Sequence, residues 1–137
     1  SITAIYTVLI EQDSMNDPVA DEVRSLIDGH IVMSRKLAER GHYPAIDVPA
    51  SLSRIASSVT DPRHQLANTN LRRLMAAYQQ VEMLLRLGEY TPGNDALTDQ
   101  AVQLHEHIDM FLQQDLRAPV VLADMLEHLY GLTEDAF

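Results

Sequence analysis

A tyrosine and an arginine on either side of a proline-rich segment have side chains suited to holding a nucleotide. Tyr43 precedes Pro44, and a residue before proline is held extended, which can present its ring as a flat stacking surface. Arg54 stands next to the hydroxyl residue Ser53, and a guanidinium can donate two parallel hydrogen bonds to phosphate oxygens. A plainer alternative packs Tyr43 in the core and pairs Arg54 with a nearby acid. Residue chemistry alone favours this plainer alternative, because aromatic and arginine residues are common in loops.

The histidines do not form a pattern typical of metal binding. The chain has 6 His and no Cys, and His105 and His107 are two residues apart on a predicted helix. They therefore lie on different faces, whereas a helix presents neighbouring ligands at i, i+3 or i+4. None of the 5 glycines stands in a Gly-x-x-x-x-Gly-Lys phosphate-binding loop. We expect neither a metal site nor a phosphate-binding loop within these residues.

We also considered whether a serine could act as a catalytic nucleophile, and the sequence does not favour this. Ser51 and Ser53 are close in sequence to His42 and Asp47. No Gly-x-Ser-x-Gly motif surrounds either serine, so the sequence lacks the sharp turn that exposes a nucleophilic serine hydroxyl in hydrolases. We therefore expect no catalytic triad here.

The overall composition excludes further classes of function. The chain has 137 residues, with 10 Lys+Arg against 20 Asp+Glu and a formal net charge of −10. Such a surface repels phosphate backbones, so we expect no nucleic-acid partner. No apolar run approaches the roughly 20 residues that a membrane-spanning helix needs. We expect an ordinary globular protein with a buried core.

The elements that must position Tyr43 and Arg54 follow from periodicity and from helix-ending residues. The first part alternates predicted strands and helices, and the rest is helical. The predicted elements are a largely buried strand over 1–10, a helix opened by Asp17 and Pro18 and ending near Ile27, a strand over 30–34, a helix over 35–40, a loop over 42–49, and helices over 62–87, 95–113 and 119–130. Asp61 and Asp95 are expected to cap the helices over 62–87 and 95–113, and the first of these has an apolar face that includes Leu71 and Leu74. Gly88 and Gly131 are expected to end the first and last of the long helices. The fold class is thus α/β and then all-α, with the change near 57–59.

The residues of the first part closely resemble the export ATPases of bacterial type III secretion systems and flagella, which are relatives of the catalytic subunits of rotary ATP synthases. The segments that carry the resemblance are 7–11, 16–32, 34–38, 42–48 and 51–54. The resemblance is nearly continuous over 1–58 and continues more loosely to about Gln114. Pro49 departs from the family, in which an aliphatic residue usually stands there.

The resemblance implies that 1–58 are the C-terminal segment of a RecA-like ATPase domain and that 59–137 form a small helical C-terminal domain. It implies a hexameric ATPase, peripheral at the cytoplasmic face of the inner-membrane export apparatus, that uses ATP and Mg²⁺ to release chaperones and unfold effectors for export. By position, Tyr43 matches the ring that stacks on adenine, and Arg54 matches the arginine finger acting in trans on the neighbouring subunit. Phe111 and Gln114 match a second edge of the adenine pocket.

The resemblance also implies partners: a homo-hexamer, a central stalk protein, a stator or regulator, and export chaperone–effector complexes. The acidic stretch Gly88–Thr98 is expected to contact the stalk. The family's phosphate-binding loop lies before residue 1, so we expect the isolated chain to be inactive and to hold no nucleotide tightly. Two alternatives remain: a non-catalytic helical module that binds a chaperone or stalk protein, and a free-standing α+β structural protein.

Overall fold

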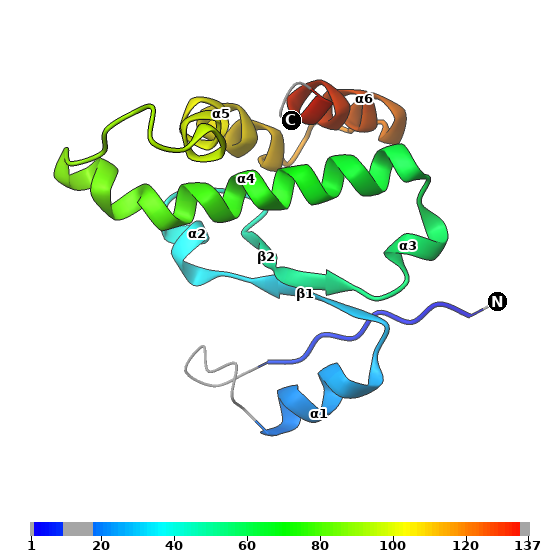
Figure 1. Ribbon diagram of the computed structural model, residues 1–137. Coiled ribbons are helices and arrows are strands. Elements are labelled where there is room, and N and C mark those ends of the chain that lie inside the picture. The colour runs from blue at the N-terminus through cyan, green and yellow to red at the C-terminus, as the bar shows by residue number, and fades with distance from the viewer. Residues whose placement is uncertain (1, 10–17, 135–137) are drawn as a thin grey trace.

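The computed structural model describes residues 2–9 and 18–134, and in it a strand-and-helix part precedes a helical region (Figure 1). The elements are α1 (Pro18–Leu26), β1 (Gly29–Met33), α2 (Arg35–Glu39), β2 (Ile46–Ser53), α3 (Ala56–Val59), α4 (Pro62–Leu87), α5 (Ala96–Leu112) and α6 (Leu122–Thr133). The long helix α4 runs through the middle, with α5 and α6 on one side and the strands on the other (Figure 1). This arrangement confirms the predicted fold class.

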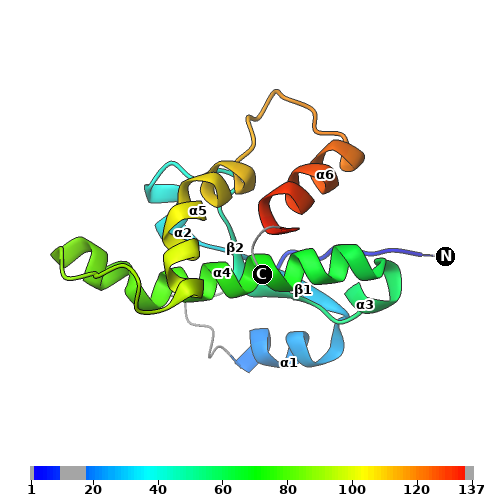
Figure 2. The ribbon, with the colours of Figure 1, turned by 45° about the horizontal axis from the view of Figure 1, so that its top comes forward.

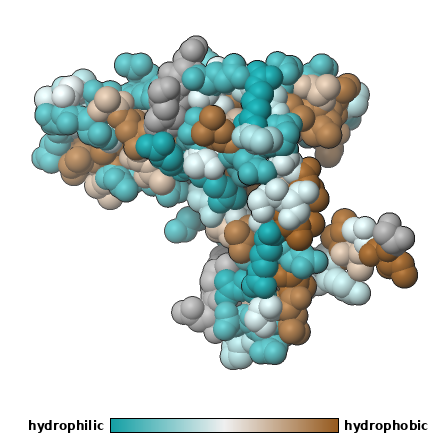
Figure 3. Space-filling model, turned by 45° about the vertical axis from the view of Figure 1, so that its right-hand side comes forward, coloured by the Kyte–Doolittle hydropathy of each residue, from teal (hydrophilic) through white to brown (hydrophobic). Residues whose placement is uncertain are grey.

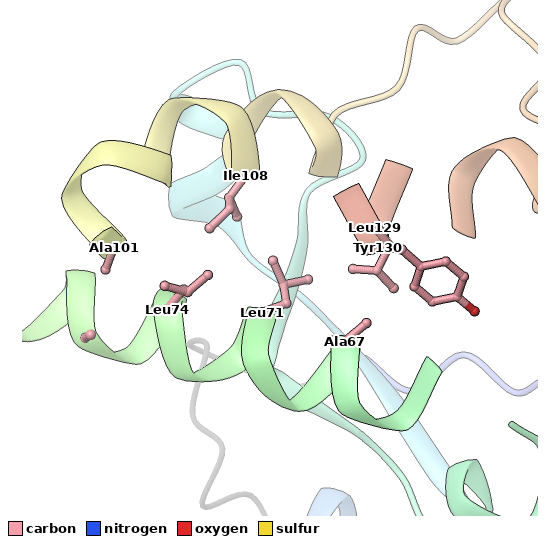
Figure 4. Close-up of a cluster of buried hydrophobic side chains, with 8 residues drawn as sticks. Ala67, Leu71, Leu74, Ala101, Ile108, Leu129 and Tyr130 are labelled. Atoms are coloured by element: carbon pink, nitrogen blue, oxygen red, sulfur yellow. The ribbon is translucent and has the colours of Figure 1, made fainter. Parts of the chain in front are cut away.

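The core of the molecule lies where α5 and α6 pack on α4. Small residues on α4 let the helices approach closely, and Leu74 at the centre is fully buried. The buried apolar side chains of this cluster are Ala67, Leu71, Leu74, Ala77, Ala101, Ile108, Leu129 and Tyr130 (Figure 4). The α4 members recur at three and four residues, as expected for one face of a helix. The core thus belongs to the helical region.

The helices α5 and α6 lie over different parts of α4 and are joined by an extended linker (Figure 2). Asp95 caps α5 as predicted, since its side chain accepts a hydrogen bond from the backbone N of Thr98 at 2.9 Å.

The predicted bounds of α6 were wrong at both ends. Val121 at its N-cap is extended, with ψ 131°, so the helix starts after Pro119 rather than at it.

The C-terminal end of α6 is set by tertiary packing rather than by glycine. Gly131 lies inside the helix, because the residues after it are needed against α4: Thr133 is 1% exposed. The backbone oxygen of Thr133 accepts a hydrogen bond from the buried side chain of Asn70, with 3.4 Å between Nδ2 and O. Arg63 of α4 also contacts this end of α6, because its guanidinium lies over the Tyr130 ring, 3.8 Å from the ring centre. These contacts outweigh the tendency of glycine to end a helix.

The strands β1 and β2 form an antiparallel pair with an irregular register. Gly29 pairs with Ser53 at one end and Met33 with Ile46 at the other, and the ladder is interrupted between His30 and Val32. The part of the predicted loop from residue 46 onward is therefore a strand, contrary to the prediction. Pro49 is tolerated because it lies in the interruption, where its missing N–H leaves no ladder bond unmade.

Residues 2–9 run as an extended segment without strand pairing, although the sequence predicts a buried strand over 1–10. Ile2 is 99% exposed and Leu9 is 92% exposed, and Figure 3 shows the segment projecting from the body with apolar surface. A strand needs hydrogen-bonding neighbours, and among the described residues the sheet consists of β1 and β2 alone. The prediction is therefore wrong for this chain, and the described residues do not cover the segment as a free-standing structural protein would require.

The helix α1 lies beyond the strands, on the side away from α4 (Figure 1). The predicted cap at Asp17 lies outside the described residues.

Over residues 2–9 and 18–134, no helix is both long enough and apolar enough to cross a bilayer.

Replacing Asp61 by Ala is expected to lower the free energy of unfolding by about 1 kcal/mol, the usual cost of losing an N-cap. The Asp61 carboxylate accepts the backbone N–H of His64 at 2.8 Å in the first turn of α4. Asp61→Asn keeps an acceptor and is expected to cost much less. Urea unfolding of the three proteins measures this, and equal stability of Asp61→Ala and the parent chain would exclude the capping role.

Candidate functional site

Tyr43 lies at the surface, just before β2. Its side chain is 56% exposed, so the alternative that packs it in the core is wrong. The segment around it is firmly held: the backbone N of the neighbouring His42 donates to the oxygen of Leu37 at 3.0 Å, and His42 is 7% exposed. The Tyr43–Pro44 peptide bond is cis. Tyr43 is thus an exposed aromatic ring on an anchored backbone, as a stacking surface requires.

Gln114 lies beside Tyr43, although the two are far apart in the sequence. The backbone N of Gln114 donates to the backbone oxygen of Tyr43 at 2.9 Å. The Gln114 side chain donates to the oxygen of Ala118 at 3.0 Å, which fixes the start of the linker after α5. Phe111 is partly buried against the helical core, and its ring meets that of His128 edge-on with 5.2 Å between centroids. The structure therefore joins Tyr43 to Gln114, and Phe111 anchors the end of α5 on the helical core.

Arg54 lies immediately after β2 and is exposed. Its guanidinium donates to two backbone oxygens at the end of α1, those of Arg24 at 3.1 Å and Ser25 at 3.3 Å. Its backbone N donates to the oxygen of Asp28 at 2.7 Å. These carbonyls attract a cation because the C-terminal end of a helix carries partial negative charge. Arg54 therefore rests on neutral carbonyls and keeps its positive charge near the surface, instead of the acid pairing that the plainer alternative expects.

Tyr43 and Arg54 lie at opposite ends of the same strand. Tyr43 precedes β2 and Arg54 follows it, and β2 has 8 residues. A strand of that length spans roughly 25 Å, somewhat less where a bulge bends it. The structure thus brings Tyr43 and Gln114 together, and it places Arg54 apart from both.

The serine that could have served as a nucleophile instead supports the backbone of β2. The Ser51 hydroxyl donates to the oxygen of Asp47 at 2.6 Å and accepts from the backbone N of Val32 at 2.9 Å. The Asp47 carboxylate accepts the backbone N–H of Ala50 at 3.0 Å. Ser51 therefore fills the interruption in the ladder, with its hydroxyl bonded to backbone atoms of both strands. The short spacing of Asp47, Ala50 and Ser51 around Pro49 is a sequence signal for such a turn, and it extends beyond the predicted loop over 42–49.

Two histidines of the helical region, His105 and His128, take part in ring contacts. His105 stacks on Tyr78 with 3.5 Å between ring centroids. In residues 2–9 and 18–134, no three His, Cys, Asp or Glu side chains are grouped in a way that could hold a metal ion.

The acidic stretch Gly88–Thr98 contains the folded connector between α4 and α5 and the first residues of α5. Gly88 adopts a left-handed conformation with φ 71° and ends α4 as predicted. The Asp99 carboxylate accepts hydrogen bonds from the Tyr90 hydroxyl and, at 2.8 Å, from the backbone N of Gly93. The connector, the end of α4 and the start of α5 line an open pocket of about 200 Å³. Asp99 therefore fixes the shape of the connector.

The hydrogen bond to Asp99 raises the pKa of Tyr90 from 10.0 to about 12. Because the folded value lies above the unfolded one, the bond stabilises the fold fully below pH 10, and the stabilisation is lost as the pH rises toward about 12. Asp99→Asn removes the negative charge beside the phenol, so the pKa of Tyr90 is expected to fall toward 10.0. Phenolate absorbance during an alkaline titration measures it, with Tyr90→Phe identifying the signal. An unchanged titration in Asp99→Asn would contradict the assignment.

Family models match both parts of the chain. The model described as the T3SS EscN ATPase C-terminal domain matches residues 60–131. The model of the ATP synthase alpha/beta family, nucleotide-binding domain, matches residues 1–53.

Curated relatives and solved structures agree with these matches. The chain is 73% identical to a type 3 secretion system ATPase of Pseudomonas syringae pv. syringae, over 97% of this chain and 30% of the relative. It is 54% identical to the SPI-2 type 3 secretion system ATPase of Salmonella typhimurium, over 98% of this chain and 31% of the relative. The structure of the assembled ATPase EscN from the enteropathogenic E. coli type III secretion system superposes with a TM-score of 0.92 at 45% identity, covering 96% of this chain and 32% of that one. The chain thus spans about a third of the length of these proteins.

Proposed function

Since the chain belongs to the family of type III secretion ATPases, we propose that it works as the C-terminal third of an ATPase that couples ATP hydrolysis to chaperone release and to the unfolding and export of effector proteins. In this proposal 1–58 complete a RecA-like nucleotide-binding domain and 59–137 form the helical C-terminal domain. The complete enzyme works as a hexameric ring at the cytoplasmic face of the inner-membrane export apparatus.

Tyr43 stacks on the adenine of ATP in this proposal, and Gln114 and Phe111 provide the second edge of the same pocket. The hydrogen bond between the backbones of Tyr43 and Gln114 supports the assignment, because it holds the two edges together. Phe111 supports this second edge through its packing on the helical core. In the complete ATPase, residues of its other two thirds would hold the phosphates and Mg²⁺, and the metal would supply positive charge to the transferred phosphoryl group. We expect residues 1–137 alone not to hydrolyse ATP, because they contain no phosphate-binding loop.

Arg54 is the catalytic residue of this chain and acts on the nucleotide of the neighbouring subunit. The observation that carries this assignment is that Tyr43 and Arg54 lie at opposite ends of β2. Because the strand separates them by roughly 25 Å, the two side chains serve different nucleotides. An arginine supplied from the neighbouring subunit stabilises the charge that develops during phosphoryl transfer.

The adenine edge can be tested by photolabelling. The full-length ATPase that contains this chain is irradiated with an azido-adenine analogue of ATP, and the labelled peptides are identified by mass spectrometry. The proposal predicts label on the peptides that carry Tyr43 and Gln114, and competition by unlabelled ATP. Label confined to peptides distant from both residues would overturn the adenine assignment.

The partners of the complete ATPase follow the same proposal. A relative's structure is that of the assembled EscN in complex with its central stalk EscO, and this chain resembles that EscN with a TM-score of 0.80 at 41% identity. We infer a central stalk protein as a partner here and place its contact at the connector Gly88–Thr98, where Glu89 and Asp95 supply negative charge. Acidic residues at a rim mainly steer a basic partner. We also infer chaperone–effector complexes and a stator or regulator as partners of the complete ATPase.

A further inference from the structure

The segment that carries Arg54 bridges a hollow between the strands and α4. Its start is the interrupted part of β2, where residues 48–51 lie outside the ladder. Its end is α3, which leads into α4. A pocket of about 330 Å³ lies beneath it, lined by Arg54, by residues of α3 and by the first two turns of α4, Gln65 among them. The position of Arg54 therefore depends on how the two ends of this segment are attached, as well as on its own backbone hydrogen bond to Asp28.

The end before Arg54 is attached to α4 by Arg72. The Arg72 guanidinium donates to the backbone oxygen of Ser51 at 3.0 Å and to that of Pro49 at 3.4 Å. Oxygens two residues apart lie along the same edge of a strand, so one planar fork reaches both. On the other edge, the ring of His30 contacts the oxygen of Ala50, with 3.2 Å from Nε2 to O. The backbone is thus held from both sides three residues before Arg54.

The end after Arg54 is attached to α4 by Gln65. The side-chain amide of Gln65 donates to the backbone oxygen of Ser57 at 3.0 Å and to that of Thr60 at 2.8 Å. Gln65 and Arg72 are seven residues apart, which is two helical turns, so they extend from the same face of α4. One face of α4 thus holds the Arg54 segment at both ends.

We propose that Arg72, together with Gln65, is a positioning residue that sets where Arg54 can reach and connects it to the movements of α4. This inference rests on the proposed role of Arg54 in trans. Arg72 touches no substrate and acts through the backbone of β2. Because α4 is also the central helix of the helical core, a shift of that core moves both attachment points and carries Arg54 with it. The hollow beneath the segment gives the arginine room to move between its carbonyl partners on α1 and the neighbouring subunit.

The test is Arg72→Ala in the full-length ATPase, with ring assembly and the melting temperature checked first. The proposal predicts that kcat falls at least about tenfold while KM for ATP stays within about twofold, because only a group acting in the transition state is displaced. Gln65→Met, which keeps the size of the side chain and removes the donor, is expected to give the same pattern and a smaller loss. Arg86→Ala is the matched control, since Arg86 also lies on α4 and pairs with Glu82 one turn away. It should leave kcat unchanged.

A double-mutant cycle separates positioning from a general structural role. If Arg72 acts through Arg54, Arg72→Ala causes no further loss of kcat in a protein that already carries Arg54→Ala. Wild-type kcat in Arg72→Ala, or an equal loss in the presence and absence of Arg54, would overturn the inference and leave the role of Arg54 intact. Should Arg54→Ala itself have no effect, the proposed function fails instead.

Discussion

Replacing Arg54 by Ala in the full-length ATPase lowers the turnover of the assembled ring by about 10³-fold or more, the usual range for an arginine finger. The physical reason is that the developing charge on the phosphoryl group loses its cation, while the adenine edge at the other end of β2 is untouched. ATP binding should therefore remain close to that of the unmodified protein. Steady-state hydrolysis and equilibrium binding of a fluorescent ATP analogue measure the two quantities separately.

Arg54→Lys is the sharper control for this first prediction. An ammonium keeps the charge but lacks the planar fork, so it should not restore turnover. Because Arg54 also donates to the oxygens of Arg24 and Ser25, both variants are first checked for an unchanged melting temperature and for ring formation. Rings of either variant that hydrolyse ATP at the unmodified rate would show that Arg54 is not the finger.

Replacing Tyr43 by Ala weakens ATP binding by about 1–3 kcal/mol, the range for losing one stack between a base and an aromatic ring. The substitution isolates the ring, because the contact with Gln114 uses the backbone oxygen of Tyr43 and survives it. Isothermal titration with a non-hydrolysable ATP analogue gives the affinity of the assembled protein.

Tyr43→Phe is the matched variant, since it keeps the ring and removes the hydroxyl. Its affinity should be close to that of the unmodified protein. A loss as large as that of Tyr43→Ala would assign the interaction to the hydroxyl, and no loss in either variant would remove Tyr43 from the pocket.

The sequence predicted best what depends on a few neighbouring residues. The N-caps Asp61 and Asp95 and the left-handed Gly88 lie where the pattern placed them, because capping is a contact within one turn. The face of α4 around Leu71 and Leu74 was predicted for a similar reason, since burial follows the helical repeat.

The elements that depend on distant partners could not be predicted in this way. The apolar run at 2–9 has the composition of a strand, yet pairing needs a neighbour that composition does not supply. Gly131 lies within α6 because Thr133 is buried against α4, which no local rule contains.

The candidate site shows the same division between local chemistry and long-range contacts. Tyr43 and Arg54 were singled out by residue type and by the family resemblance. The contact of Tyr43 with Gln114 and the attachment of Ser51 to Arg72 join segments far apart in the chain, so they became visible only in the folded structure.

The central claim is that Arg54 completes the nucleotide site of the adjacent subunit, and a mixed-ring measurement tests it most directly. Arg54→Ala subunits are mixed with subunits whose phosphate-binding loop has been disabled, and each is inactive alone. In a ring of head-to-tail contacts, about a quarter of the sites then combine an intact loop with an intact Arg54. The account predicts that the 1:1 mixture recovers up to about a quarter of the unmodified turnover. A mixture that forms rings and stays as inactive as its components would contradict it.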